Sequence, residues 1–238
     1  MRLGVIGGLG PIATAYFLEL VIKMTDAHCD QEHLEMVIYN CPSIPDRTSY
    51  ILGKSKDNPV IPMVHIGKQL VKQGADYIAI PCITAHCFHE TLTKAIKVPI
   101  IHIVKETVLH LKENGVKKVG ITATDGTINS RLFQKELIAL GVDFVLPSKK
   151  AQQDIMDLIY KNIKAGLPAE LDKFLKISQE LRGNGAEVII LGCTELSLIK
   201  RDYSIGAGYI DAMEVLAKAS ILSCQGLLKR QYEYLITE

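Results

Sequence analysis

Two cysteines stand at matching places in the chain and are the residues best suited to chemistry. Cys82 and Cys193 each follow an apolar, strand-like run directly, and each is followed closely by a threonine. A thiol at a strand-to-helix turn lies near free backbone N–H groups, which favour the thiolate and lower the thiol pKa from about 8.5. Those amides also bind carboxylates. Each loop is therefore a candidate site for an acid–base thiol beside a bound acid.

A pair of opposed thiols suits one kind of reaction. Inversion at a carbon atom needs one proton removed from one face and another delivered to the opposite face, and a thiolate and a thiol provide both. A cysteine taken alone is more often a buried residue that fills space. The matching positions of Cys82 and Cys193 favour the catalytic interpretation for both.

Short apolar runs alternate with amphipathic stretches along the chain, which predicts strands separated by helices. The expected strands cover residues 3–6, 35–39, 77–80, 98–101, 118–121, 142–146 and 187–191. The expected helices cover residues 12–24, 60–73, 104–113, 129–140, 152–165, 168–182 and 212–232, with one more after residue 86. Residues 40–57 are expected to form a long polar loop. Alternating strands and helices imply parallel sheets covered on both faces.

The series of strand, loop and helix occurs twice. In each half a Gly- or Thr-rich loop follows the first strand, and a Cys-containing loop follows a later one. The sequence therefore predicts two similar α/β lobes, the first from residues 1–100 and 212–238 and the second from residues 101–211. Ligands of such sheets bind beyond the carboxyl ends of the strands, so the expected site lies in a cleft between the lobes.

Composition excludes several classes of protein. Of 238 residues, 48% are hydrophobic and 22% charged, which supports a real core and excludes a disordered chain. A net charge of +1 without a basic block argues against nucleic-acid binding. The apolar runs are too short to span a membrane, and the start leads straight into a strand-like segment, so we expect a soluble cytoplasmic protein. Six cysteines without a C-x-x-C pair indicate neither a disulfide framework nor a zinc ribbon.

Five sequence pieces, in this order along nearly the whole chain, resemble the aspartate/glutamate racemase family of cofactor-independent amino-acid racemases. They are GGLGPIAT at 7–14, DQEH at 30–33, IPDRT at 44–48, PCITAH at 81–86 and LGCTEL at 191–196. The resemblance implies two pseudo-symmetric Rossmann-like lobes and a two-base mechanism at Cys82 and Cys193. It also implies that the enzyme needs no pyridoxal phosphate or other cofactor, takes a small acidic amino acid as substrate and forms a homodimer.

The resemblance also implies how the substrate is held. Arg47 would bind the side-chain carboxylate, which suits the forked guanidinium, and Lys164 would be a second cationic contact. Thr84 and Thr194, with the amides of their loops, would hold the α-carboxylate and part of the charge that develops at Cα.

The remaining implied residues line or support this site. Leu9, where the family usually has Met, would line the pocket, and Ala85 belongs to the same substrate-binding set. His86 and Glu195 would support the two cysteine loops from behind.

One position departs from the family pattern. The first cysteine loop usually reads Pro-Cys-Asn-Thr-Ala-His, and Ile83 stands here in place of the Asn. An apolar residue removes an amide side chain that would touch the substrate, while the backbone amides of the loop remain. The departure therefore bears on substrate preference and leaves the two-base mechanism in place.

Two other kinds of site are weighed against this interpretation. The G-x-G-x-x-A pattern at residues 8–13 resembles a dinucleotide-binding turn, but Tyr39 and Asn40 stand where an acidic residue would hold the ribose. Cys82, His86 and His89 follow helical spacing, but no second Cys/His cluster completes a metal site, so no metal is predicted.

The sequence thus predicts an isomerase that interconverts L- and D-aspartate, with glutamate as a second candidate substrate. One alternative is a broad-specificity amino-acid racemase or a hydantoin- or maleate-type relative on the same fold. Another is a protein that binds a small acid without chemistry, and a third is a nicotinamide-linked oxidoreductase.

Overall fold

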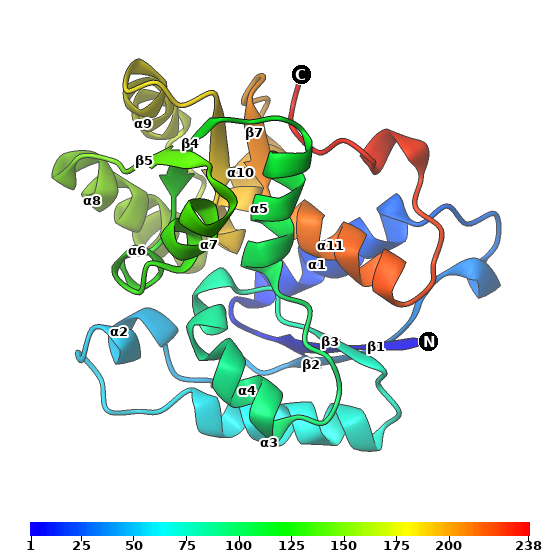
Figure 1. Cartoon of the computed structure of the whole chain (residues 1–238). Coiled ribbons are helices and arrows are strands. Elements are labelled where there is room, and N and C mark those ends of the chain that lie inside the picture. Colours follow the sequence, from blue (N-terminus) through cyan, green and yellow to red (C-terminus); the bar gives the residue numbers. More distant parts are fainter. The chain divides into compact units, whose positions relative to one another are not determined.

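The computed structural model describes residues 1–238, and the chain divides into two compact α/β units. Unit 1 comprises Met1–Ile103 and Met213–Leu235, and unit 2 comprises Val104–Ala212 and Ile236–Glu238 (Figure 1). The last three residues, expected with the first unit, belong to unit 2. They do so because Ile236 forms an antiparallel bridge with Ile210, and the Thr237 amide donates to the Tyr209 carbonyl at 2.8 Å.

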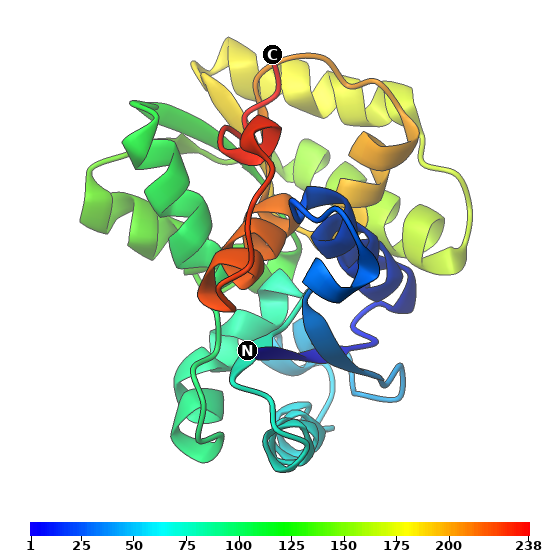
Figure 2. The same cartoon turned by 90° about the vertical axis from the view of Figure 1, so that its right-hand side faces the viewer.

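Unit 1 is built on a three-stranded parallel sheet of order β2-β1-β3. Its strands are β1 (Arg2–Gly7), β2 (Glu35–Asn40) and β3 (Tyr77–Ala79). Its helices are α1 (Pro11–Met24), α2 (Arg47–Ile51), α3 (Val60–Lys72), α4 (His89–Ala95) and α11 (Ala212–Ser223), with a short 3-10 turn η1 (Asp30–Glu32). Figures 1 and 2 show α3 and α4 on one face of the sheet and α1 and α11 on the other. The α/β class with covered parallel sheets is confirmed.

The centre of unit 1 follows from its sequence. Leu3, Val5 and Ile6 of β1 are fully buried, as expected of a middle strand covered on both faces. After β1 the chain turns at Gly8, which has φ +91, and a Cβ there would collide with the Cys41 backbone. Only glycine fits this turn, and Pro11 then starts α1, where its missing N–H costs nothing.

Two expectations for unit 1 are wrong in detail. Residues 98–101 form no regular strand, and only Ile100 makes a parallel bridge with Ile78. The loop at 40–57 contains the helix α2. Asp46 fixes the start of this helix, because its side chain accepts a hydrogen bond from the Ser49 amide at 2.7 Å. Side-chain capping of this kind stabilises even a short helix.

Unit 2 holds a four-stranded parallel sheet of order β5-β4-β6-β7. Its strands are β4 (Lys118–Thr122), β5 (Asp143–Val145), β6 (Val188–Leu191) and β7 (Tyr209–Asp211). Its helices are α5 (Ile103–Glu113), α6 (Asp125–Asn129), α7 (Leu132–Leu140), α8 (Lys149–Asp157), α9 (Leu171–Gly183) and α10 (Thr194–Asp202). Figure 2 shows α8, α9 and α10 on one side of this sheet and α5 and α7 on the other.

The helices of unit 2 are more broken than their sequence pattern predicts. The helix expected over 129–140 starts only at Leu132, as α7, because Arg131 before it adopts a left-handed conformation with φ 58. The helix α6 precedes it, in a stretch that was expected to be mostly a loop. The stretch expected over 152–165 begins as α8 and continues as a π-helical turn η3 (Leu158–Asn162) and a 3-10 turn η4 (Ile163–Ala165). This η3–η4 segment ends at Gly166, again left-handed.

Other elements differ from expectation near the end of the chain. The helix α10 and the strand β7 were not expected, since residues 192–196 were interpreted as a loop alone. The last helix ends at Ser223 rather than Tyr232, because Gln225 is left-handed with φ 63 and the chain beyond contains only the 3-10 turn η5 (Arg230–Tyr232). No helix combines the length and the apolar composition that a membrane crossing would need.

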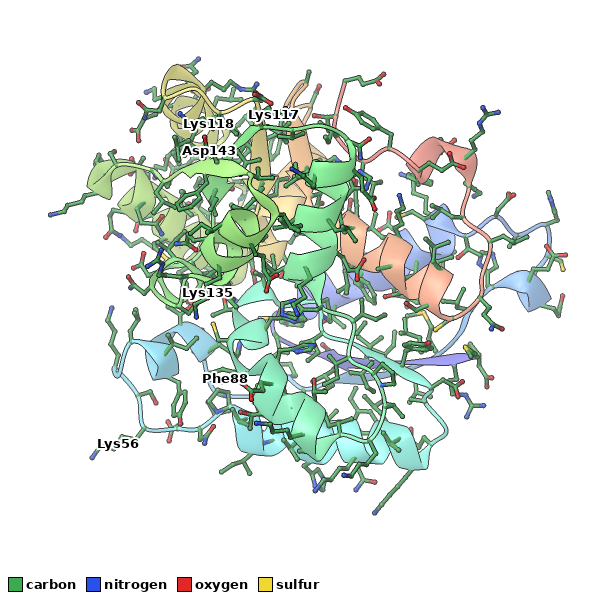
Figure 3. The ribbon with its side chains drawn as sticks, viewed as in Figure 1. Lys56, Phe88, Lys117, Lys118, Lys135 and Asp143 are labelled. Carbon is green, nitrogen blue, oxygen red and sulfur yellow. The ribbon has the colours of Figure 1, made fainter.

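Both cysteine loops lie where parallel sheets hold ligands. Cys82 follows the carboxyl end of β3, and Cys193 follows that of β6. Figure 3 labels Lys117, Lys118 and Asp143, which mark the opposite, amino ends of β4 and β5, where Lys118 and Asp143 pair in register.

We expect Gly192→Ala to destabilise unit 2 where the chain enters the Cys193 loop. A Cβ at Gly192 would lie 2.8 Å from the Thr122 carbonyl oxygen and 2.9 Å from Phe133 Cε2. Overpacking of this kind costs about 1–3 kcal/mol of unfolding free energy, measurable by urea denaturation. Gly183→Ala is the matched control, because nothing lies within 4 Å of its added Cβ at the end of α9. Equal effects of the two substitutions would contradict the close packing.

Candidate active site

The first thiol lies in a tight, buried loop of unit 1. Cys82 is the N-cap of a 3-10 helix, η2 (Ile83–Phe88), and its backbone is extended with φ −156. The Cys82 amide donates to the Ile80 carbonyl at 2.7 Å, and its carbonyl accepts from the Ala85 amide at 3.2 Å. The Cys82 side chain is 5% exposed, in one apolar cluster with Leu9 and Ala85. The loop thus brings three residues of the predicted site together.

Arg47 joins this group through backbone contacts. It is the first residue of α2 and is only 6% exposed, although it belongs to a stretch that was expected to be a polar loop. Its Nη1 donates to the carbonyls of Ile44 at 3.3 Å and Pro45 at 3.0 Å, and its Nη2 donates to that of Leu9 at 2.7 Å. The guanidinium therefore fixes the turn after β1 against the loop that precedes α2.

The helix η2 is held from both of its ends. Phe88, labelled in Figure 3, ends η2, and its ring packs on Tyr50 of α2 with 5.9 Å between centroids. Toward the start of η2, Thr84 and Ile83 are both buried. The short helix that carries Cys82 thus packs on the short helix that carries Arg47.

Three histidines stack behind the Cys82 loop. The ring centroid of His86 lies 5.9 Å from that of His89 and 5.3 Å from that of His102. The centroids of His89 and His102 are 4.3 Å apart. Burial, and then the positive charges that His102 and His89 would carry, hold the pKa of His86 well below its usual value. His86 is therefore neutral at pH 7, with its Nε2 3.4 Å from the Ile80 carbonyl oxygen.

His102 was not predicted as part of this arrangement. The helical spacing of His86 and His89 gave half of the signal, whereas His102 is the residue just before α5, which only the fold brings near. His86 is stacked on His89 and on His102, whereas the rings of His89 and His102 are tilted by 45°. No group of three or more His, Cys, Asp or Glu side chains is arranged to hold a metal ion.

The second thiol caps the helix α10 in unit 2. Cys193 occupies the N-cap position, and Thr194 is the first residue of the helix. The Cys193 Sγ donates to Glu195 Oε2 at 2.9 Å, and the Thr194 hydroxyl donates to the same oxygen at 3.4 Å. Glu195 thus supports the loop directly, with its own side chain 5% exposed.

Lys164 reaches the same loop from the η3–η4 segment. Its Nζ lies 2.7 Å from Glu195 Oε1 and 5.6 Å from the ring centroid of Tyr160. The structure therefore brings Lys164, Cys193, Thr194 and Glu195 together. Tyr160 was missed by sequence reasoning, although an aromatic residue four positions before a lysine is a usable signal for such a contact.

The position of Cys193 at a helix start predicts a lowered thiol pKa, but its surroundings have the opposite effect. Burial raises the pKa of the Cys193 thiol well above its usual range, and the neighbouring Glu195 carboxylate raises it further. The Lys164 ammonium acts in the opposite direction but does not outweigh them. The thiol form of Cys193 is therefore favoured, whereas its position alone predicts the thiolate.

A family model described as Asp/Glu/Hydantoin racemase matches residues 6–220, which include both cysteine loops. The chain belongs to the Asp/Glu/hydantoin racemase family. The resemblance found in the five sequence pieces is thereby confirmed.

Similar proteins include racemases with different substrates in their names. The chain is 31% identical to the Picrophilus torridus aspartate racemase, with a TM-score of 0.83 and 98% of each chain covered. It is 29% identical to the broad specificity amino-acid racemase RacX of Bacillus subtilis, over 92% of this chain and 96% of that one. The fold is shared with the glutamate racemase of Francisella tularensis, 18% identical, with a TM-score of 0.67 over 96% of this chain and 83% of that one.

Membership of the racemase family supports an isomerase activity on amino acids. The predicted site residues of this member of the family form two local groups. In unit 1, Leu9, Arg47, Cys82, Ile83, Thr84, Ala85 and His86 lie on the turn after β1, on α2 and on the η2 loop. In unit 2, Glu195 is the contact that Lys164, Cys193 and Thr194 share.

We expect the stability of the protein to fall below pH 6.5 through His86. The folded protein keeps His86 neutral while the unfolded chain binds a proton near pH 6.5, so this contribution is complete above pH 6.5 and is lost as the pH falls. Between pH 7 and pH 5, His86→Gln should remove about 1–2 kcal/mol of the decline in unfolding free energy, measured by urea denaturation.

The exposed His65 supplies the control for that measurement, as His65→Gln should keep the pH dependence of the unmodified protein. The same decline in His86→Gln as in the unmodified protein would show that His86 is not the titrating group.

Proposed function

We propose that this racemase interconverts L- and D-aspartate without a cofactor, with Cys82 and Cys193 as its two acid–base groups. The observation that supports this most is the equivalent placement of the two thiols. Each is a buried N-cap residue, within three residues of the end of a parallel strand, in a separate α/β unit. A reaction that needs one proton donor and one acceptor explains why both units carry such a thiol.

The proposed reaction moves two protons. One cysteine, as thiolate, takes the proton from Cα as the C–H bond breaks, and the other gives its S–H proton to the opposite face of the carbanion. The first cysteine is then a thiol and the second a thiolate, so the reverse reaction uses the same groups with exchanged roles. The mechanism requires both loops to reach one substrate.

Most of the catalysis must come from stabilising the carbanion, because the α-proton of aspartate is only weakly acidic. In the proposal, Thr84 and Thr194, with the amides of their loops, hold the α-carboxylate and the charge that spreads onto it. Preorganised donors in a buried site are worth more than the same donors in water. The burial of both threonines supports this role.

Aspartate is proposed as substrate on two grounds. Arg47 and Lys164 provide two cationic side chains, one in each unit, for the carboxylate groups of an acidic amino acid. The chain is also similar along nearly its whole length to the Picrophilus torridus aspartate racemase.

Broad specificity is a second candidate, which a specific observation favours. Ile83 and Leu9, both buried beside Cys82, are apolar, and Arg47 already donates to three backbone carbonyls. Such surroundings suit uncharged side chains as well as acidic ones, and the similarity to RacX agrees with this. For either substrate range we propose a homodimer, as the family resemblance implies, which analytical ultracentrifugation tests.

We expect deuterium at Cα of aspartate when the enzyme is incubated with L-aspartate in D₂O and followed by NMR, together with loss of optical rotation. Cys82→Ala and Cys193→Ala should each lower the rate of racemisation by about 10³-fold or more, because each removes one of two necessary proton carriers. Cys29→Ala changes an exposed cysteine away from both loops and should leave the rate unchanged.

Parallel incubations with L-glutamate and L-alanine rank the side chains that the site accepts. Comparable rates for all three would favour the broad-specificity candidate over aspartate. No exchange with any of them would contradict the proposed function and favour a binding role. Full activity in both alanine variants would contradict the assignment of Cys82 and Cys193 as the acid–base groups.

Ile83→Asn should raise the preference for aspartate over alanine. The substitution restores an amide side chain to the Cys82 loop, and one hydrogen bond to a charged group corresponds to a change of about tenfold or more in relative kcat/KM. Ile83→Val keeps the position apolar and serves as the control. An unchanged ratio in Ile83→Asn would show that this side chain does not contact the side-chain carboxylate of the substrate.

A further inference from the structure

The carboxylate of Glu195 connects every polar group of the Cys193 loop. One oxygen, Oε2, accepts from the Cys193 thiol at 2.9 Å and from the Thr194 hydroxyl at 3.4 Å. The other, Oε1, lies 2.7 Å from Lys164 Nζ. The helix α10 packs against both η3 and η4, so the three partners of Glu195 are held by neighbouring elements.

Charge balance within this group depends on the proton of Cys193. With a Cys193 thiol, the carboxylate and the ammonium cancel. Loss of that proton would place a thiolate and a carboxylate 2.9 Å apart in a nearly water-free setting, with one cation for two anions. Like charges at this distance disfavour double ionisation strongly.

Other charges near the loop do not alter this balance. The strand β6 before Cys193 contributes only apolar side chains, and Lys200, Arg201 and Asp202 stand in the last turn of α10. The buried Asp211 of β7 accepts from the Ser197 hydroxyl at 2.6 Å. Glu195 and Lys164 are therefore the charges that act on the Cys193 sulfur.

The Cys82 loop has no equivalent of this group in its sequence. Glu195 is the second residue after Cys193, and the second residue after Cys82 is Thr84, with Ile83 between them. His86, at the end of the same sequence piece, is neutral at pH 7 because of its burial. The two thiols, equivalent in fold, thus differ in electrostatic surroundings.

We propose that Glu195, held in place by Lys164, is a positioning residue that keeps Cys193 protonated in the free enzyme. Cys193 is then the proton donor of the free enzyme. The assignment of this catalytic role rests on the proposed function, whereas the protonation of Cys193 does not. After a turnover that leaves a thiolate beside Glu195, Cys193 regains a proton before it can act as donor again.

The proposal is tested by the reactivity of Cys193 toward iodoacetamide between pH 6 and pH 10, without substrate. Alkylation at each cysteine is quantified by mass spectrometry, with the exposed Cys29 of the same molecule as internal reference. Glu195→Gln should raise the rate at Cys193 relative to Cys29 by about tenfold or more at pH 8, the effect of a pKa lower by one unit. Lys164→Met should lower that ratio by about tenfold, because it removes the opposing cation.

Two further variants separate charge from packing. Lys164→Arg keeps the cation and should retain the reactivity of the unmodified protein. Lys161→Met removes a lysine of the same segment that pairs with Asp157 instead, at 2.9 Å, and should also change nothing. A merely structural role of Glu195 and Lys164 predicts changes in the same direction for Glu195→Gln and Lys164→Met, rather than opposite ones.

An unchanged or lower ratio in Glu195→Gln, or a higher one in Lys164→Met, would overturn the proposal. If Cys193 is too buried to be alkylated in any variant, thiolate absorbance at 240 nm measures its ionisation instead. The Glu195→Gln protein should then show thiolate absorbance below pH 9 that the unmodified protein lacks. This absorbance should disappear in the double variant that also carries Cys193→Ser. If Glu195→Gln shows no such gain, the proposal is overturned.

Circular dichroism identifies a Glu195→Gln protein that fails to fold, and the ratios for Lys164→Met and Lys164→Arg then decide alone. Because alkylation needs no substrate, failure of the proposed function would appear separately, as absence of α-proton exchange in the unmodified enzyme.

Discussion

The ion pair between Glu195 and Lys164 is the interaction on which the second cysteine loop depends. A carboxylate that is nearly excluded from water needs both a cation and hydrogen-bond donors, and here it has Lys164, the Cys193 thiol and the Thr194 hydroxyl. The π-helical turn and the 3-10 turn after α8 carry Lys164 to this place. Their irregular geometry is typical of segments that position functional side chains.

The first cysteine loop achieves rigidity in a different way. Arg47 donates to three backbone carbonyls, and Asp46 caps α2. Behind the loop, the buried His86 stays neutral. The Cys82 thiol is thus surrounded by apolar groups and satisfied backbone, whereas the Cys193 thiol touches a carboxylate. Two similar α/β units thus place their thiols alike but surround them with different groups.

The features that the sequence predicted well are local ones. Glycine turns, apolar runs and Pro11 at a helix start act within a few residues, so β1, α1, β3, β6 and both cysteine positions follow from the sequence. What it could not predict depends on contacts between distant segments: the burial of Arg47 against Leu9, the pairing of Lys164 with Glu195 and the approach of His102 to His86. The helix α10 was missed because Thr194 and Glu195, two polar residues after Cys193, resemble a loop although they begin a helix.

The central claim is that two different groups remove and deliver the proton, and isotope content in the first turnovers tests it most directly. L-Aspartate with protium at Cα is mixed with enzyme in D₂O, and the reaction is stopped before one tenth of the substrate has reacted. The two enantiomers are then separated, and the deuterium content of each is measured by mass spectrometry. The account predicts deuterium in essentially every molecule of D-aspartate and protium retained in the remaining L-aspartate, since the delivering thiol has exchanged with solvent. Protium transferred into D-aspartate would contradict it, because a single group would then have carried the same proton from one face of Cα to the other.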